Sequence, residues 1–173
     1  MFWLTLISKF IKAMRAGQTP FQIAAGFCFG YLIGLMPFFT LQGLLLFFVL
    51  FLLNINLGAA TFAILICSFF AYLLDPVFHN LGYYILVQIP ALQNFWETLY
   101  NLPVAPLTRF NNTVVMGSFV FGIVTVIPVY FGMRKFVLVY RSGLEERIKK
   151  WKIVKMITGS KLYGLYTKIR EIV

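Results

Sequence analysis

The sequence predicts an all-α integral membrane protein with short discontinuous or re-entrant helices, a full C-terminal transmembrane helix and basic amphipathic helices at both ends. Of its 173 residues, 61% are hydrophobic and only 12% are charged, about half the charged share of a soluble domain. A soluble domain of this length still exposes roughly a third of the surface that its unfolded chain exposes. It could not hide so much apolar area, so the soluble classes are excluded.

The placement of charge indicates the same class. No Lys or Arg occurs between Arg15 and Arg109, and most of the net charge of +10 lies from Arg134 onward. Basic residues that flank apolar segments set membrane orientation and attract anionic lipids, so we expect no nucleic-acid partner. They predict a multi-pass membrane protein with both termini in the cytoplasm.

Residues 2–15 are predicted to form an amphipathic helix, because apolar side chains recur there every three or four positions. Such a helix lies in the membrane interface with its basic side toward lipid phosphates. The expected lipid head-group contacts on this helix are Lys9, Lys12 and Arg15.

A second helix is predicted over residues 20–36. Thr19 and Gln22 have the spacing of a capping box, and Pro20 suits the first helical position. Pro37 cannot continue the helix, so we expect the helix to end before it.

Gly26, Gly30 and Gly34 form one row on this second helix. Glycines spaced four residues apart let two backbones approach closely, which is how apolar helices associate in lipid. We therefore expect this row to pack tightly against another helix, either in the same chain or in a second copy of a homo-oligomer.

The helices predicted over residues 41–53 and 58–74 are short for a membrane crossing. They rise roughly 20 and 25 Å, against a hydrocarbon core of about 30 Å, and the links 37–40 and 54–57 carry no charge. Half-crossing helices that meet in a re-entrant hairpin fit these lengths better than full spans do. Whether the segment 20–53 spans or re-enters decides whether the chain crosses two or four times.

The pair Asp75-Pro76 is predicted to end one helix and to begin another over residues 76–89, because Asp caps helices and Pro suits their first position. The stretch 91–112 then mixes aromatic residues, prolines and amides. This composition is typical of an outer-face loop with a short interfacial helix.

The last and clearest span is predicted over residues 113–141, where a long uncharged run ends at Arg134 and Lys135. It closes a membrane domain of residues 1–141, and residues 142–173 are predicted to form a basic amphipathic tail in the cytoplasm. The expected head-group contacts in this half of the chain are Arg134, Lys135, Lys149, Lys150 and Lys152.

A series of small and polar residues stands at the predicted helix ends, namely Gly30, Gly34, Pro37, Gln42, Asn54, Asn56 and the pair Asp75-Pro76. In this pattern, and in the segments LLDPVFHNLGY and LTRFNNT, residues 5–141 resemble an uncharacterised inner-membrane family of bacteria with outer membranes. That family is related to a broader domain of unknown function with a G-x-x-x-G-x-x-P…Q…N…N-P pattern. The resemblance implies a partner, because members tend to be encoded beside a much larger envelope protein.

The polar residues at the breaks are candidates for a functional site. The hypothesis is that they surround one polar, water-accessible cavity, because unpaired backbone groups at membrane depth are costly and survive only with shared partners or water. The simpler interpretation is that the amides only satisfy the broken backbone, with Asp75 as a helix cap and His79 as an interfacial side chain. The candidates are Pro37, Gln42, Asn54, Asn56, Asp75, Pro76 and His79.

Enzyme chemistry is not expected. The chain has one histidine and five acids, and it shows no nucleophile with a base at readable spacing, so we expect no catalytic residue, metal or cofactor. Proteins with paired re-entrant helices move lipids between leaflets, and this analogy of fold favours an envelope lipid-handling subunit. The alternatives are a small-solute or ion transporter or channel, and a membrane anchor or assembly subunit without transport.

Overall fold

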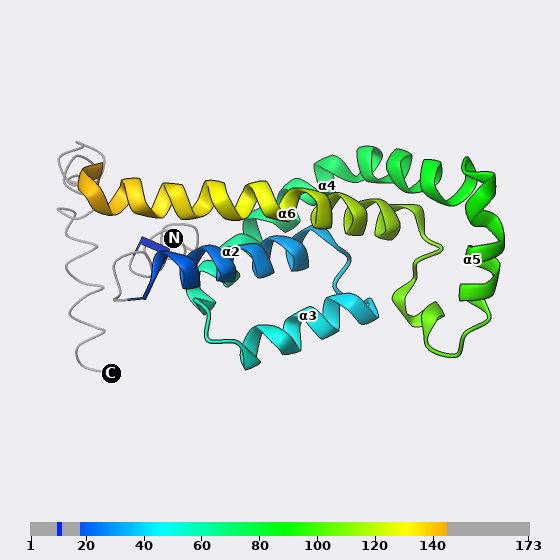
Figure 1. The fold of residues 1–173 in the computed structure, drawn as a ribbon, viewed down its shortest axis with the longest axis horizontal. Coiled ribbons are helices and arrows are strands. Elements are labelled where there is room, and N and C mark those ends of the chain that lie inside the picture. Colours follow the sequence, from blue (N-terminus) through cyan, green and yellow to red (C-terminus); the bar gives the residue numbers. More distant parts are fainter. Residues whose placement is uncertain (1–9, 12–17, 145–173) are drawn as a thin grey trace, which may run out of the picture. The chain divides into compact units, whose positions relative to one another are not determined.

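The computed structural model describes residues 10–11 and 18–144, and every regular element among them is a helix (Figure 1). Of the predicted helix 2–15, only Phe10 and Ile11 are described, and most of the basic tail lies outside the described residues. The chain divides into two compact units, residues 1–135 and 136–173. The described part of the second unit is the end of the last long helix and a short π-helical turn, Tyr140–Leu144, where Phe136 stacks on Tyr140.

Helix α2 (Pro20–Leu35) begins with the capping box that its sequence predicts. The Thr19 hydroxyl accepts a hydrogen bond from the Gln22 backbone at 3.2 Å, and the Gln22 side chain accepts one from the Thr19 backbone at 2.9 Å. Helix α3 (Leu41–Leu52) follows after a short link and is capped by the Thr40 hydroxyl. Figure 1 shows α2 in blue and α3 in cyan as the two arms of a hairpin.

Helix α4 (Leu57–Val87) is 31 residues long and contains Pro76 in its interior. The predicted helix boundary at Asp75-Pro76 is therefore wrong, and so is the alternative that Asp75 caps a helix. An interior proline removes one helical hydrogen bond, but packing on both sides of the proline holds this helix together. Gly34 lies on Ile64 before the proline, and Gly117 lies on Phe78 after it.

Past α4, a 3-10 turn (Pro90–Leu92), helix α5 (Gln93–Tyr100) and a second 3-10 turn (Ala105–Thr108) form the loop that the sequence predicts with a short helix. Helix α6 (Thr113–Val139) is the last long helix of the described residues. Its start is capped by Asn112, whose side-chain oxygen accepts from two backbone amides at 3.0 and 3.1 Å.

The glycine row of α2 lies directly on the backbone of α4. A methyl group added at Gly30 would meet the carbonyl of Ala60, and one added at Gly26 would meet the carbonyl of Asn56. Contacts advance by four residues on both helices, so α2 and α4 run parallel. Gly34 continues the row, where an added Cβ would lie 2.8 Å from the Ile64 carbonyl oxygen.

A second pair of glycines joins α4 to α6. Gly82 lies on the Thr113 carbonyl and Gly117 lies on the Phe78 carbonyl, each too close for a side chain, so these two helices run antiparallel. Further along α6, the Thr125 and Tyr31 hydroxyls are hydrogen-bonded at 2.6 Å, which places α6 against α2 as well. The three helices α2, α4 and α6 thus pack through small residues and a few polar contacts.

Candidate functional site

The structure does not place the predicted polar residues around one cavity. Pro37 and Asp75 line the same pocket, whereas Asn56 lies at the opposite end of α2, where its backbone N–H donates to the Gln22 carbonyl at 3.1 Å. The 16 residues of α2 separate these ends by about 24 Å. Gln42, Asn54, Pro76 and His79 do not line the pocket either.

The pocket that holds Asp75 has a volume of about 420 Å³ and lies where α2 ends beside the middle of α4. Most of its wall is apolar, and its polar side-chain groups are those of Ser68, Tyr72 and Asp75. The residues that line it are Ile33, Gly34, Leu35, Met36, Pro37, Phe38, Ile64, Ser68, Ala71, Tyr72 and Asp75.

Electronegative groups converge on this pocket. The last carbonyls of a helix have no helical partner and carry partial negative charge, and α2 ends here. Pro76 has no N–H to donate to the Tyr72 carbonyl one turn earlier. Together with the Asp75 carboxylate, these oxygens favour a ligand that is positively charged or donates hydrogen bonds.

The Asp75 side chain is half-buried, and among residues 10–11 and 18–144 no hydrogen bond or ion pair reaches its carboxylate. A half-buried charge without a partner is costly unless water or a ligand solvates it. Asp75 is therefore the group of this pocket most suited to bind something from outside the chain.

Gln42 connects two other elements of the fold and does not line this pocket. Its side-chain N–H donates to the Thr108 carbonyl at 3.0 Å, which ties the start of α3 to the second 3-10 turn. Its side-chain oxygen is buried and has no hydrogen-bond partner among the described residues. Gln42 thus fastens the hairpin to the loop rather than lining the Asp75 pocket.

Asn54 and Asn56 belong to the link before α4, and only Asn56 is buried. The Asn56 side-chain oxygen caps α4 by accepting from the Ala59 backbone at 2.7 Å, and its amide donates to the Gln18 side chain. This agrees with the simpler interpretation of the amides, since Asn56 satisfies the broken backbone.

We expect Asn56→Ala to lower the free energy of unfolding by about 1–3 kcal/mol, because it removes a helix cap and leaves buried groups unpaired. Asn56→Asp is the matched control, since Asp caps equally well but cannot donate to Gln18. Thermal unfolding in detergent would show Asn56→Ala as the less stable variant. Equal stability of Asn56→Ala and the wild type would contradict the capping role.

His79 joins α4 to α6, with its Nδ1 atom 2.7 Å from the Thr113 hydroxyl. Ser68, Tyr72 and Gly82 are not among the residues predicted from the sequence. The free carbonyl of Tyr72 could have been predicted from the sequence, because Tyr72 stands four residues before Pro76. The place of Gly82 and the exposure of Ser68 toward the pocket depend on how the helices pack, and no local signal marks them.

Of the residues expected to contact lipid head groups, Arg134 and Lys135 are described and both are exposed. Lys9, Lys12, Arg15, Lys149, Lys150 and Lys152 lie outside the described residues. Within the part of the chain that the structure describes, no three His, Cys, Asp or Glu side chains gather in a way that could hold a metal ion.

Comparison with known proteins places the chain among bacterial proteins. Residues 5–144 match the model of a family described as "Uncharacterized protein conserved in bacteria (DUF2062)". An uncharacterized protein of Treponema pallidum (strain Nichols) is 28% identical over 151 residues, which are 87% of this chain and 93% of the relative. No solved structure matches the chain. The region matched by the family contains α2 to α6 and therefore the whole Asp75 pocket.

Proposed function

The chain belongs to the bacterial family DUF2062. We propose that it is a multi-pass inner-membrane protein that handles lipids for the cell envelope. Two helices, Leu57–Val87 and Thr113–Ser142, are long and apolar enough to cross a membrane. In the most apolar window of each, only 28% of the positions are buried by the rest of the protein. The core helix of a soluble protein would be mostly covered, so a lipid environment accounts better for these apolar surfaces.

The ends of α6 suggest where the membrane surfaces lie. Arg134 and Lys135 mark the cytoplasmic side, and Thr113 lies about 32 Å away along the helix, which suits a hydrocarbon core of about 30 Å. Phe21 packs edge-on against Tyr130, with ring centroids 6.1 Å apart. Helix α2 would therefore start near the cytoplasmic surface.

On this placement, α2 and α3 form a re-entrant hairpin. Helix α2 rises about 24 Å from the cytoplasmic side and α3 returns about 18 Å. The hydrogen bond between Asn56 and Gln22 brings the chain back to the level at which α2 started. The hairpin stops short of the outer surface, and the Asp75 pocket lies at its tip.

The Asp75 pocket is the single observation that carries the proposal. A carboxylate at membrane depth is costly and usually faces a cavity or a functional partner. Beside it, Tyr72 is 79% exposed and Phe38 is also exposed, so the pocket would open toward lipid. A lipid could place its polar head group in the pocket while its tails stay in the bilayer.

We further propose that a much larger envelope protein is the partner of this chain, which the resemblance of the sequence implies. The chain would then be the inner-membrane subunit that translocates lipid between leaflets or loads lipid onto that partner. The basic residues Arg134 and Lys135 would hold the subunit at the anionic cytoplasmic surface.

Reconstitution of the full-length chain in liposomes tests the proposal. The liposomes carry a phospholipid with a fluorescent head-group label and an entrapped soluble dye, and a membrane-impermeant reductant is added outside. We expect the reductant to quench label from both leaflets while the dye stays inside. Release of dye without lipid movement would identify a channel or transporter, and neither change would identify an anchor; either result would contradict lipid handling.

Topology is a separate prediction, tested in a variant in which Cys28 and Cys67 are replaced by alanine. We expect Asn94→Cys in α5 to react with a membrane-impermeant maleimide in spheroplasts, because α5 would lie on the outer side. Lys135→Cys should react only after the membrane is permeabilised. The opposite labelling pattern would contradict the proposed orientation.

A further inference from the structure

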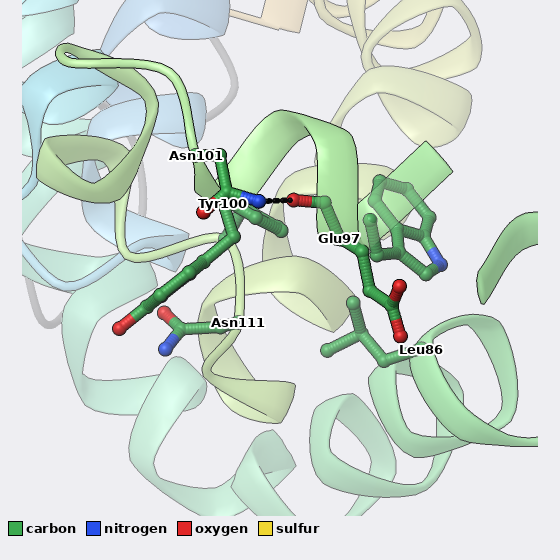
Figure 2. A pocket seen from close by; sticks show the side chains of 7 residues that line it. Leu86, Glu97, Tyr100, Asn101 and Asn111 are labelled. Atoms are coloured by element: carbon green, nitrogen blue, oxygen red, sulfur yellow. Dashed lines mark hydrogen bonds between the residues drawn. The ribbon is translucent and has the colours of Figure 1, made fainter. Parts of the chain in front are cut away.

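A second pocket lies where the end of α4 meets α5 and the loop that follows it (Figure 2). It is a shallow pocket, open to solvent, with a volume of about 420 Å³. Its wall combines the carboxylate of Glu97 and the amides of Asn101 and Asn111 with three aromatic rings, those of Trp96, Tyr100 and Phe110. Figure 2 shows the Glu97 carboxylate reaching toward Leu86 on α4.

The aromatic wall is held in place by contacts within the chain. The indole N–H of Trp96 donates to the Ile85 carbonyl at 3.3 Å, and its ring lies 5.9 Å from that of Phe110. The Asn101 side chain donates to the Glu97 carbonyl at 2.9 Å and so fixes the turn that carries the acid. A wall that is already ordered lowers the cost of binding a ligand.

Glu97 is exposed, and among residues 10–11 and 18–144 no hydrogen bond or ion pair reaches its carboxylate, so the carboxylate is open to a ligand from solvent. Between Arg15 and Arg109 the chain has only two acids, Asp75 and Glu97, and each lines one of the pockets described above. Each of these pockets therefore has one negatively charged side chain in its wall.

A carboxylate beside aromatic rings suits an alkylammonium group. The carboxylate accepts charge-assisted hydrogen bonds from the ammonium N–H groups, and the faces of Trp and Tyr attract the cation. We propose that the pocket around Glu97 binds the ammonium group of an amine-bearing lipid head group. This inference rests on the proposed lipid-handling function, and it narrows the substrate to lipids with a positively charged amine.

The position of the pocket along α4 places it next to the head-group layer of the proposed outer surface. Leu86 lies about 10 Å along α4 past His79, whose bond to Thr113 would mark the outer surface of the hydrocarbon. A bilayer with its head groups is about 40–45 Å thick around a core of about 30 Å, so each head-group layer is about 5–8 Å thick and this pocket lies just beyond its outer edge. Asp75 is about 16 Å further back along α4, and a head group would therefore meet the two acids in succession.

Trp96 provides the readout for a test. The chain has three tryptophans, so Trp3→Phe with Trp151→Phe leaves Trp96 as the sole reporter in the full-length protein in detergent. Short-chain phosphatidylethanolamine, added below its micelle concentration, should change the Trp96 fluorescence saturably. We expect phosphatidylglycerol with the same chains to bind at least about tenfold more weakly, because it has no ammonium group.

Glu97→Gln keeps the size of the side chain and removes its charge, so we expect it to weaken phosphatidylethanolamine binding by about tenfold or more. Asn94→Ala, on the same helix but outside the pocket, is the matched control and should bind as the wild type does. Tyr100→Leu should weaken binding too, because it removes one of the aromatic rings that line the pocket. Equal binding of the two lipids, or unchanged binding by Glu97→Gln, would overturn the inference.

Ethanolamine alone forms a further arm of the titration. Binding of free ethanolamine as tight as that of the lipid would overturn the assignment to a lipid and leave a site for a soluble amine. The outcome is independent of the liposome experiment. If lipid fails to move but Glu97-dependent binding persists, lipid handling fails and the amine site stands; if lipid moves and Glu97→Gln binds normally, only the amine site fails.

Discussion

Gly30→Leu is expected to abolish the folded form of the protein in detergent. The Gly30 α-carbon faces the Ala60 carbonyl so closely that even a methyl group would overlap the α4 backbone. A leucine there must push the two helices apart, which also removes the contacts of Gly26 and Gly34. Overpacking usually costs about 1–3 kcal/mol, and we expect this cost to be at the upper end or beyond it because the obstacle is backbone. Size-exclusion profiles and thermal unfolding would measure the loss.

Gly132→Leu is the matched control for this prediction. Gly132 lies on α6, and no described atom lies within 4 Å of the position that its Cβ would take. We expect this variant to be as stable as the wild type or slightly more stable, because leucine favours the helix over glycine. If Gly30→Leu folded as well as Gly132→Leu, the close packing of α2 on α4 would be wrong.

Asp75→Asn is expected to remove lipid movement in liposomes and to leave the fold intact. The carboxylate has no partner among the described residues, so losing its charge breaks no contact that the described chain makes. Asparagine has nearly the same shape but cannot attract a cationic head group. We expect the initial rate to fall by about tenfold or more, which corresponds to at least about 1.4 kcal/mol of lost stabilisation of the limiting step.

Two variants control this experiment. Asp75→Glu keeps the charge and should retain part of the rate. Asn80→Ala alters an exposed polar residue of α4 that lines neither pocket, and it should move lipid as the wild type does. Full activity of Asp75→Asn would show that the pocket is not part of the lipid path.

The local features of the fold were readable from the sequence. The capping box of Thr19 and Gln22 formed as its spacing predicts, because the atoms involved belong to one turn. The row of Gly26, Gly30 and Gly34 marked a packing face, since few other patterns place glycine at every fourth position of an apolar helix. The helix on which this row packs could not be predicted, because no local feature of the sequence distinguishes α4 from α6.

The continuity of α4 could not be read locally. Asp75-Pro76 has the composition of a helix boundary, and it would have been one in a chain without neighbours. Here α2 packs on the helix before the proline and α6 packs on it after the proline, and these contacts outweigh the lost hydrogen bond. Tertiary packing thus overrides the local signal for a helix boundary at Asp75-Pro76.

The prediction that the polar residues surround one cavity was wrong for a related reason. The sequence places Asn56 and Asp75 at apparent helix breaks, and a shared cavity requires that those breaks meet. Because α2 and α4 run parallel, the start of α4 lies beside the start of α2, and only residues further along α4 reach the end of α2. The relative direction of two helices is set by how the whole chain packs. Asp75 could therefore be proposed as a site residue from the sequence, but the residues that surround it in the pocket could not.

Photo-crosslinking with lipids tests the central claim most directly, namely that a lipid head group enters the Asp75 pocket. One phospholipid carries a diazirine on its head group and a second carries it at the end of an acyl chain. After irradiation in liposomes, mass spectrometry of the peptides locates the adducts. The head-group probe should label residues that line the pocket, such as Pro37, Ser68 and Tyr72, and Asp75→Asn should reduce this labelling. Head-group adducts confined to Arg134, Lys135 and the ends of the helices, with none at the pocket, would contradict the claim.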